Sequence, residues 1–159
     1  MTYTQHYDSP LGGILLAADE EGLTGLWFDG QKYFARTLPK EYAESETPVL
    51  CEAKRWLDIY FSGREPDFTP PLHPVGSAFQ QAVWELLEIP YGETTTYGTL
   101  ARKLAEKQGL THMSAQAVGG AVGHNDISLI IPCHRVVGAS GSLTGYAGGV
   151  DKKIKLLEL

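Results

Sequence analysis

"GREPDFTPPLHPVG", residues 63–76, separates two halves of the chain whose sequence patterns differ. Its four prolines and its lack of helix or strand periodicity indicate a semi-rigid linker. We therefore expect one domain over residues 1–75, with the Pro-rich segment at its end, and a second domain over residues 76–159. A chain of 159 residues, 43% of them apolar, is long enough for two small domains that share an interface.

The beginning of the first half predicts a small sheet. Three short segments, residues 2–7, 12–18 and 23–29, are separated by turns rich in Pro, Gly and Asp. This spacing is typical of a meander of three antiparallel strands.

A helix should follow the sheet. From Thr47 to Phe61 the apolar residues recur with the 3.6-residue period of one helix face. Thr47 can cap the helix, Pro48 suits its first turn, and Gly63 can end it. We expect its apolar face to cover the sheet.

The half after the linker is predicted to be mostly helical. Ser77 and Gln80 form a capping box at the start of a helix over residues 77–89, which Pro90 would stop. The stripe of this helix that we expect to be buried consists of Phe79, Val83, Leu86 and Leu87.

Two further short helices are predicted over residues 97–109 and 114–125, and their tight connection makes a helix-turn-helix plausible. The second of them contains three glycines, each of which lowers helix propensity by roughly 1 kcal/mol relative to alanine. This cost is explained if the helix must be approached closely, either by a neighbouring helix or by the backbone of a nucleic acid. Residues 151–159 predict a closing amphipathic helix.

The net charge of −6 would by itself argue against a nucleic-acid partner. However, residues 1–75 hold 6 Lys/Arg and 12 Asp/Glu, whereas residues 76–159 hold 7 of each. The excess of acid therefore lies entirely in the first half. The net charge does not argue against a nucleic-acid partner for the second half.

The chain contains two cysteines, Cys51 and Cys133, which lie far apart in the sequence. Their spacing indicates neither a disulfide framework nor a cysteine-based zinc site, and it fits a reducing interior. The first residues show no secretory signal, and no apolar stretch approaches the length of a membrane span. We expect a cytoplasmic protein that does not act at a membrane.

Cys133 lies in "SLIIPCHRVV", residues 128–137. An isolated cysteine is usually a small buried hydrophobe, and we assign Cys51 to that class. Cys133 differs, because Pro132 fixes the backbone before it, while His134 and Arg135 can favour a thiolate and supply a proton acceptor. In a regular strand Cys133 and His134 would point to opposite faces, so the pair requires a bend or a bridging water. The residues alone fit either a cysteine hydrolase or an acceptor that keeps the transferred group.

Four motifs, at residues 90–98, 116–125, 130–137 and 141–149, read "PYGETTTYG", "QAVGGAVGHN", "IIPCHRVV" and "GSLTGYAGG". Together they resemble the methylated-DNA–protein-cysteine methyltransferases, the O6-alkylguanine-DNA alkyltransferase family, and the PCHR element is the most specific of them. The resemblance extends over essentially the whole chain. It implies an α+β fold, with a small ribonuclease H-like N-terminal domain of antiparallel sheet and helix. A mostly helical C-terminal domain of the winged helix-turn-helix type would follow.

The resemblance also implies direct repair of double-stranded DNA. The alkyl group of O6-alkylguanine would pass irreversibly to Cys133, once per protein molecule, and O4-alkylthymine would be a second substrate to test. A monomer without metal, cofactor or obligate protein partner would suffice.

Site residues follow from the resemblance position by position. The catalytic group would be Cys133, with His134 acting through a water molecule and Glu158 near the place of the acid that completes the relay. The base pocket would be formed by Asn125, Val136, Tyr146 and Ala147. The DNA-binding residues would be Tyr97, Gln116, Ala117, Gly119 and Gly120.

Three positions depart from the family pattern. Gln116 stands where many members have arginine, Asp126 stands where a proline often follows the hinge asparagine, and the acid of the relay would fall just beyond Leu159. We expect Gln116 to assist base flipping less strongly than arginine. We also expect Asp126 to place an acid near the DNA face and to loosen that turn.

A binding module that recognises alkylated guanine without accepting the alkyl group is the alternative function. Relatives of that kind replace the cysteine of the PCHR motif, and this chain retains Cys133.

Overall fold

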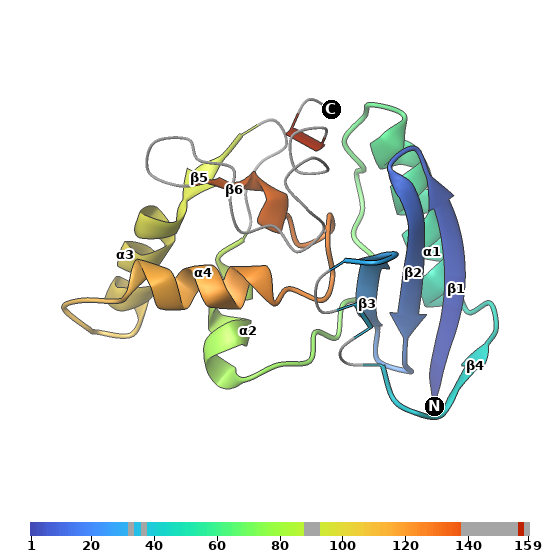
Figure 1. Cartoon of the computed structure of the whole chain (residues 1–159), viewed down its shortest axis with the longest axis horizontal. Coiled ribbons are helices and arrows are strands. Elements are labelled where there is room, and N and C mark those ends of the chain that lie inside the picture. The colour runs from blue at the N-terminus through green and yellow to red at the C-terminus, as the bar shows by residue number, and fades with distance from the viewer. Residues whose placement is uncertain (32–33, 36–37, 88–92, 138–155, 158–159) are drawn as a thin grey trace. The chain divides into compact units, whose positions relative to one another are not determined.

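The computed structural model describes residues 1–31, 34–35, 38–87, 93–137 and 156–157. The chain forms two compact units (Figure 1). The first unit contains Met1–Val75 together with Asp126–Ile130. The second contains Gly76–Asn125 and the chain that continues from Ile131.

The first unit contains a four-stranded sheet in the order β3-β2-β1-β4. β1 (Thr2–Ser9) pairs antiparallel with β2 (Gly12–Ala18), which pairs antiparallel with β3 (Leu23–Phe28). These pairings confirm the three predicted strands. β4 (Tyr42–Glu44) was not predicted, because its three residues are too few to show a period, and it pairs in parallel with β1.

Helix α1 (Pro48–Phe61) packs against the sheet (Figure 1). Thr47 caps it by accepting a 3.3 Å hydrogen bond from the backbone N–H of Leu50, and Gly63 takes a left-handed φ of +88° just after it ends. Both observations confirm the predicted helix limits. The buried face of α1 consists of Leu50, Ala53, Trp56, Leu57 and Tyr60. Burying a leucine side chain such as Leu50 or Leu57 contributes about 1.5–3 kcal/mol.

The free edge of β3 is covered by two short segments that are distant in sequence. Leu23 donates to the Pro71 carbonyl and accepts from the His73 N–H, both at 2.8 Å. Leu26 pairs in the same way with residues 126–128. Covering an edge strand blocks pairing with other chains. Residues 71–73, which the composition assigns to the linker, thus add backbone hydrogen bonds to the sheet.

His73 also joins the β2–β3 turn through its side chain. Its Nδ1 lies 2.7 Å from Asp19 Oδ2 and its Nε2 lies 3.0 Å from Glu21 Oε2. The hydrogen bond with Asp19, together with the charges of both acids, raises the pKa of His73 above its ordinary value of 6.5. Partial burial acts to raise the pKa of Asp19, but hydrogen bonds from His73 and from two backbone N–H groups outweigh it and lower that pKa.

We expect His73→Gln to lower the free energy of unfolding in a pH-dependent way. A raised folded-state pKa means that the His73 contribution is complete below about pH 6.5 and is lost as the pH rises through the raised value. Because the ring is 40% exposed, the contribution is limited to about 0–1 kcal/mol. Urea unfolding of both proteins at pH 5.5 and pH 9 measures it. A difference that grows toward pH 9 would contradict this prediction.

The second unit begins with helix α2 (Ala78–Glu85). The predicted capping box is confirmed, because Ser77 Oγ accepts from the Gln80 N–H at 3.1 Å and Gln80 Oε1 accepts from the Ser77 N–H at 3.0 Å. The helix ends earlier than predicted, and residues 88–92 lie outside the described part of the chain. Of the expected stripe, Val83 and Leu87 are buried while Phe79 and Leu86 are half-buried.

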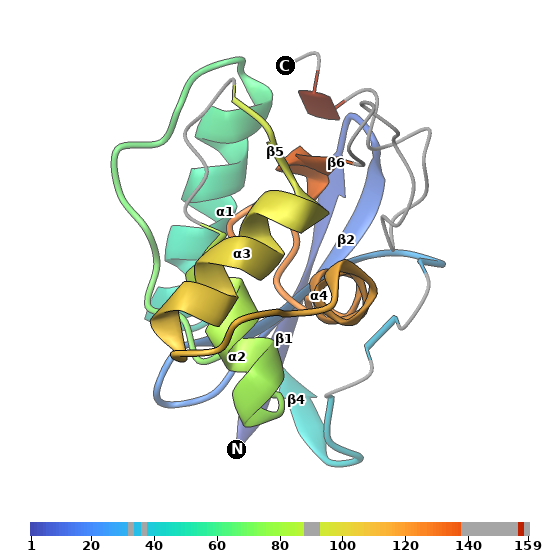
Figure 2. The same cartoon turned by 90° about the vertical axis from the view of Figure 1, so that its left-hand side faces the viewer.

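Helices α3 (Tyr97–Lys107) and α4 (Ala115–Gly123) contact each other and α2 (Figure 2). The buried residues of α3 are those predicted: Leu100, Ala101, Leu104 and Ala105. Trp84 of α2, which the predicted stripe omitted, is buried, and its indole Nε1 donates a 2.9 Å hydrogen bond to the Ala121 carbonyl of α4. This bond joins α2 to the last turn of α4.

A two-stranded parallel pair, β5 (Thr95–Thr96) and β6 (Val136–Val137), completes the described part of this unit. Of the predicted closing helix, residues 156–157 are helical and the rest lies outside the described residues. None of the helices in the described ranges combines the length and the apolar character that crossing a membrane requires.

Candidate active site

The chain bends at Cys133. Pro132, with φ −80° and ψ 63°, is the centre of an inverse γ-turn closed by a 2.8 Å hydrogen bond from the Cys133 N–H to the Ile131 carbonyl. A turn of 3-10 helix, Cys133–Arg135, follows. Successive side chains of a 3-10 turn are about 120° apart, not on opposite faces. The regular strand that would have separated Cys133 from His134 is therefore not formed.

The two cysteines differ in burial. Cys51 is exposed on the first turn of α1, so its assignment as a buried hydrophobe is wrong. It follows Leu50 directly and falls outside the buried face of the helix. Partial desolvation and the nearby Glu46 raise the pKa of its thiol. Cys133 is only 5% exposed and His134 only 1%.

Tyr97 lies at the start of α3 and within electrostatic range of Cys133. Burial, together with the negative charge that Cys133 can carry, raises the pKa of Tyr97. The side chain is therefore a neutral phenol that can donate a hydrogen bond. A Cβ atom built at Gly119 would lie 3.6 Å from the Tyr97 ring, which is an ordinary contact.

The two central glycines of α4 are not required by packing. A Cβ atom at Gly120 would have no neighbour within 4 Å, and the one at Gly119 meets no clash. Gly120 is exposed, as are Gln116 and Ala117 on the same helix, whereas Val118, Ala121 and Val122 are buried. Helix α4 therefore presents a face of small or uncharged side chains to the surroundings.

Asn125 closes a loop that leads from α4 to the cysteine. It is 3% exposed, and its Nδ2 donates a 2.8 Å hydrogen bond to the Ile131 carbonyl. The next residue, Asp126, is also 3% exposed, and its Oδ1 accepts a 3.1 Å hydrogen bond from the indole Nε1 of Trp27. The carboxylate that we expected near the DNA face is therefore buried and hydrogen-bonded to Trp27. The residues gave no signal for this contact, because Trp27 and Asp126 are 99 positions apart.

The remaining predicted site residues divide into two groups. Val136 is fully buried and pairs with Thr95 in the small parallel pair. Tyr146, Ala147 and Glu158 lie outside the described residues. The structure thus brings Tyr97 near Cys133, joins Asn125 to Ile131, and places residues 116, 117, 119 and 120 on one helix.

Positive charge near the helix-turn-helix is modest. Arg102, Lys103 and Lys107 are exposed on α3, and Lys107 Nζ lies 3.3 Å from Glu85. Among the described His, Cys, Asp and Glu side chains, no group of three or more gathers in a way that could hold a metal ion.

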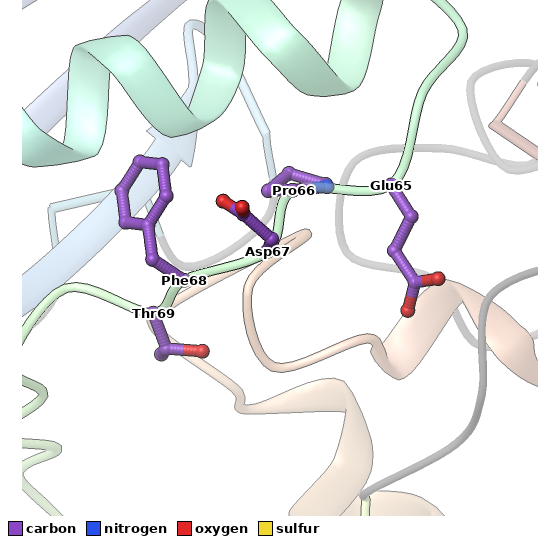
Figure 3. A pocket seen from close by; sticks show the side chains of 5 residues that line it. All are labelled: Glu65, Pro66, Asp67, Phe68 and Thr69. Carbon is purple, nitrogen blue, oxygen red and sulfur yellow. The ribbon is translucent and has the colours of Figure 1, made fainter.

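A separate pocket lies in the first unit. It is lined by residues 65–69 (Figure 3). Phe68 points toward α1, where the Arg55 guanidinium lies 5.0 Å from the centre of its ring. The lining provides two carboxylates and a threonine hydroxyl but no thiol, amine or imidazole, so it does not carry the chemistry of Cys133.

Two family models match the chain. Residues 2–74 match the ribonuclease-like domain of 6-O-methylguanine DNA methyltransferase, and residues 78–159 match its DNA binding domain. The chain belongs to this family. The family assignment confirms the resemblance of the four motifs, and with it the α+β fold of a ribonuclease-like domain followed by a DNA-binding domain.

Named relatives support the assignment over the full length of the chain. Proteins named methylated-DNA–protein-cysteine methyltransferase are 42% identical in Haemophilus influenzae and 45% identical in Methanosarcina acetivorans. Each alignment covers 99% of this chain, and 85% and 97% of the respective relative. The crystal structure of Mycobacterium tuberculosis OGT in complex with DNA superposes with a TM-score of 0.84 at 41% identity, covering 99% of this chain and 91% of that one. Both the sequence and the fold of this chain therefore support its place in the methyltransferase family.

Proposed function

We propose that the protein repairs O6-alkylguanine in double-stranded DNA by transferring the alkyl group to Cys133. The thiolate attacks the alkyl carbon, so an S–C bond forms while the bond from that carbon to guanine O6 breaks. The electron pair of the broken bond remains on the guanine, which takes up the proton that the thiol released by way of His134. The product is a thioether, which has no good leaving group, so each molecule acts once.

The observation that carries the proposal is the position of Cys133. The thiol follows the Pro132 turn, is 5% exposed, and lies near the phenol of Tyr97. The family assignment supports the same chemistry, and the retained Cys133 disfavours a module that only binds alkylated DNA.

The DNA would be contacted through α4. Its exposed Gln116, Ala117 and Gly120 permit close approach to a minor groove, and Gly119 lies beside Tyr97. A base inside a duplex cannot be reached by a side chain, so the alkylated nucleotide must rotate out, which requires a few kcal/mol. Tyr97 would press on the adjacent phosphate, and Gln116 would hydrogen-bond the unpaired partner base.

The pocket for the rotated base is assigned by family position. Asn125 would hold the start of the active-site loop, while the Val136 carbonyl, Tyr146 and Ala147 would line the base. Glu158 would support His134 near the family position of the relay acid. We further assign the protein to the cytoplasm, where a nucleophilic thiol stays reduced, and infer that it acts as a monomer, because one thiol and one base complete the reaction.

A stoichiometry measurement tests the function. A duplex with a single O6-methylguanine is incubated with increasing amounts of protein, and restored guanine is quantified by nuclease digestion and chromatography. The expected result is one restored guanine per protein molecule. A cysteine hydrolase would instead leave the methylated base unchanged and turn over small esters repeatedly, which would contradict the proposal.

We expect Gln116→Arg to tighten duplex binding and to steepen its salt dependence. The additional positive charge at the DNA should steepen the slope of log K against log salt by up to about 0.9, the value for one neutralised phosphate. Fluorescence anisotropy at several salt concentrations measures both quantities. Gln108→Arg, which adds the same charge at the end of α3, is the matched control. An equal effect from the control would show that position 116 has no specific place in the complex.

A further inference from the structure

The segment that leads to Cys133 begins on the sheet of the first unit. Leu26 donates a 2.7 Å hydrogen bond to the Asp126 carbonyl and accepts a 3.2 Å hydrogen bond from the Ser128 N–H. Together they form a parallel bridge centred on Ile127. Residues 126–128 are therefore held in register with β3.

A side-chain hydrogen bond reinforces this register. Trp27 is fully buried, Asp126 is 3% exposed, and the indole N–H of Trp27 donates to Asp126 Oδ1 at 3.1 Å. Burial of a carboxylate is unfavourable unless N–H groups donate to it. A donor fixed in a packed core therefore allows only a narrow range of positions for Asp126.

The backbone between this anchor and the cysteine is strained. Leu129 has a φ of +70°, and the Ile130 N–H donates a 2.8 Å hydrogen bond to the Ser128 carbonyl across it. A bulky residue in the left-handed region is a genuine outlier, and it persists only where the surroundings hold both ends of the turn. Leu129 is 1% exposed, which fixes its side chain. The Asp126 anchor lies before this turn, and the Asn125–Ile131 hydrogen bond closes the loop that contains it.

We propose that Asp126 and Trp27 are positioning residues for the transfer reaction. Their hydrogen bond fixes the start of the segment, so that the strained Leu129 turn and the Pro132 turn deliver Cys133 in its reactive orientation. This inference rests on the proposed function of Cys133 as the acceptor. It gives the N-terminal sheet an indirect part in the reaction, through the position of Cys133.

Single-turnover methyl transfer at varied DNA concentration tests the proposal. Asp126→Ala and Trp27→Phe should each lower the saturating rate constant by about 10- to 100-fold, the loss expected from a misplacement on the order of 1 Å. The DNA concentration that gives half of the maximal rate should stay within about two-fold, since neither residue would touch DNA. Because the residues act as a pair, the double variant should be no slower than the slower single variant.

Asp126→Asn and Tyr7→Phe serve as controls. Asp126→Asn keeps an oxygen acceptor for the Trp27 N–H and should retain the rate within about three-fold. Tyr7→Phe removes the 2.6 Å hydrogen bond from the Tyr7 hydroxyl to Asp58 elsewhere in the first unit. It should leave the rate unchanged, which separates positioning from a general loosening of that unit. Near-ultraviolet circular dichroism verifies that each variant is folded.

The result that would overturn the inference is a folded Asp126→Ala or Trp27→Phe protein that transfers methyl groups at the wild-type rate. An equal loss of rate in Tyr7→Phe would also overturn it. If the wild-type protein transfers no methyl group at all, the proposed function itself fails, so the two failures are distinguishable.

Discussion

Cys133→Ser should leave O6-methylguanine unrepaired in a duplex while binding that duplex with an affinity within about three-fold of the wild type. Serine differs from cysteine by one atom, so a site that is 5% exposed should accommodate it. Its hydroxyl gives up a proton far less readily than a thiol, so it is a weak nucleophile. Quenched-flow transfer assays and fluorescence anisotropy measure the two quantities.

Cys51→Ser is the matched control for this prediction. Cys51 is exposed on α1, and the change should alter neither transfer nor binding. Repair by folded Cys133→Ser protein, or loss of repair in Cys51→Ser, would remove Cys133 from its proposed role.

Asn125→Ala should have the second largest effect. The change removes the 2.8 Å hydrogen bond to the Ile131 carbonyl and leaves that acceptor without this donor. We expect a loss of about 1–3 kcal/mol in the free energy of unfolding. The rate of transfer should fall by about 100-fold, because the loop that carries Cys133 is no longer closed. Thermal unfolding and single-turnover kinetics measure these effects.

His124→Ala is the control for the hinge. His124 Nδ1 lies 2.7 Å from the Gly120 carbonyl, so this variant also removes a side-chain contact to the backbone at the end of α4. The His124→Ala variant keeps the hydrogen bond from Asn125 to the Ile131 carbonyl, so it should keep most of the transfer rate. Equal rates in the two variants would mean that helix stability, and not loop closure, determines activity.

Local signals predicted much of the fold. The caps at Thr47 and Ser77 could be predicted from the sequence, because an N-cap depends on residues within one turn of each other. The buried face of α3 could be predicted because it follows from the helical spacing of its apolar residues. The same spacing could have predicted that Cys51 is exposed, because Cys51 lies beside the apolar stripe that contains Leu50 and Ala53. The prediction of burial followed the residue type instead.

Contacts between distant residues could not be predicted. Strand β4 pairs in parallel with β1 through only three residues, and the edge of β3 is covered by residues 71–73 and 126–128. The burial of Asp126 depends on Trp27, so an acid that the sequence places on a surface turn lies in a core. The strain at Leu129 has no sequence signal either, because its neighbours impose it.

The mass of the Cys133 peptide after reaction shows whether the methyl group reaches this thiol. Wild-type protein is incubated with an excess of duplex that contains O6-methylguanine, digested with trypsin and analysed by tandem mass spectrometry. We expect the Cys133 peptide to gain a single methyl group in place of the thiol hydrogen, in an amount equal to the guanine restored, while the Cys51 peptide is unchanged. An unmodified Cys133 peptide alongside restored guanine would contradict this expectation.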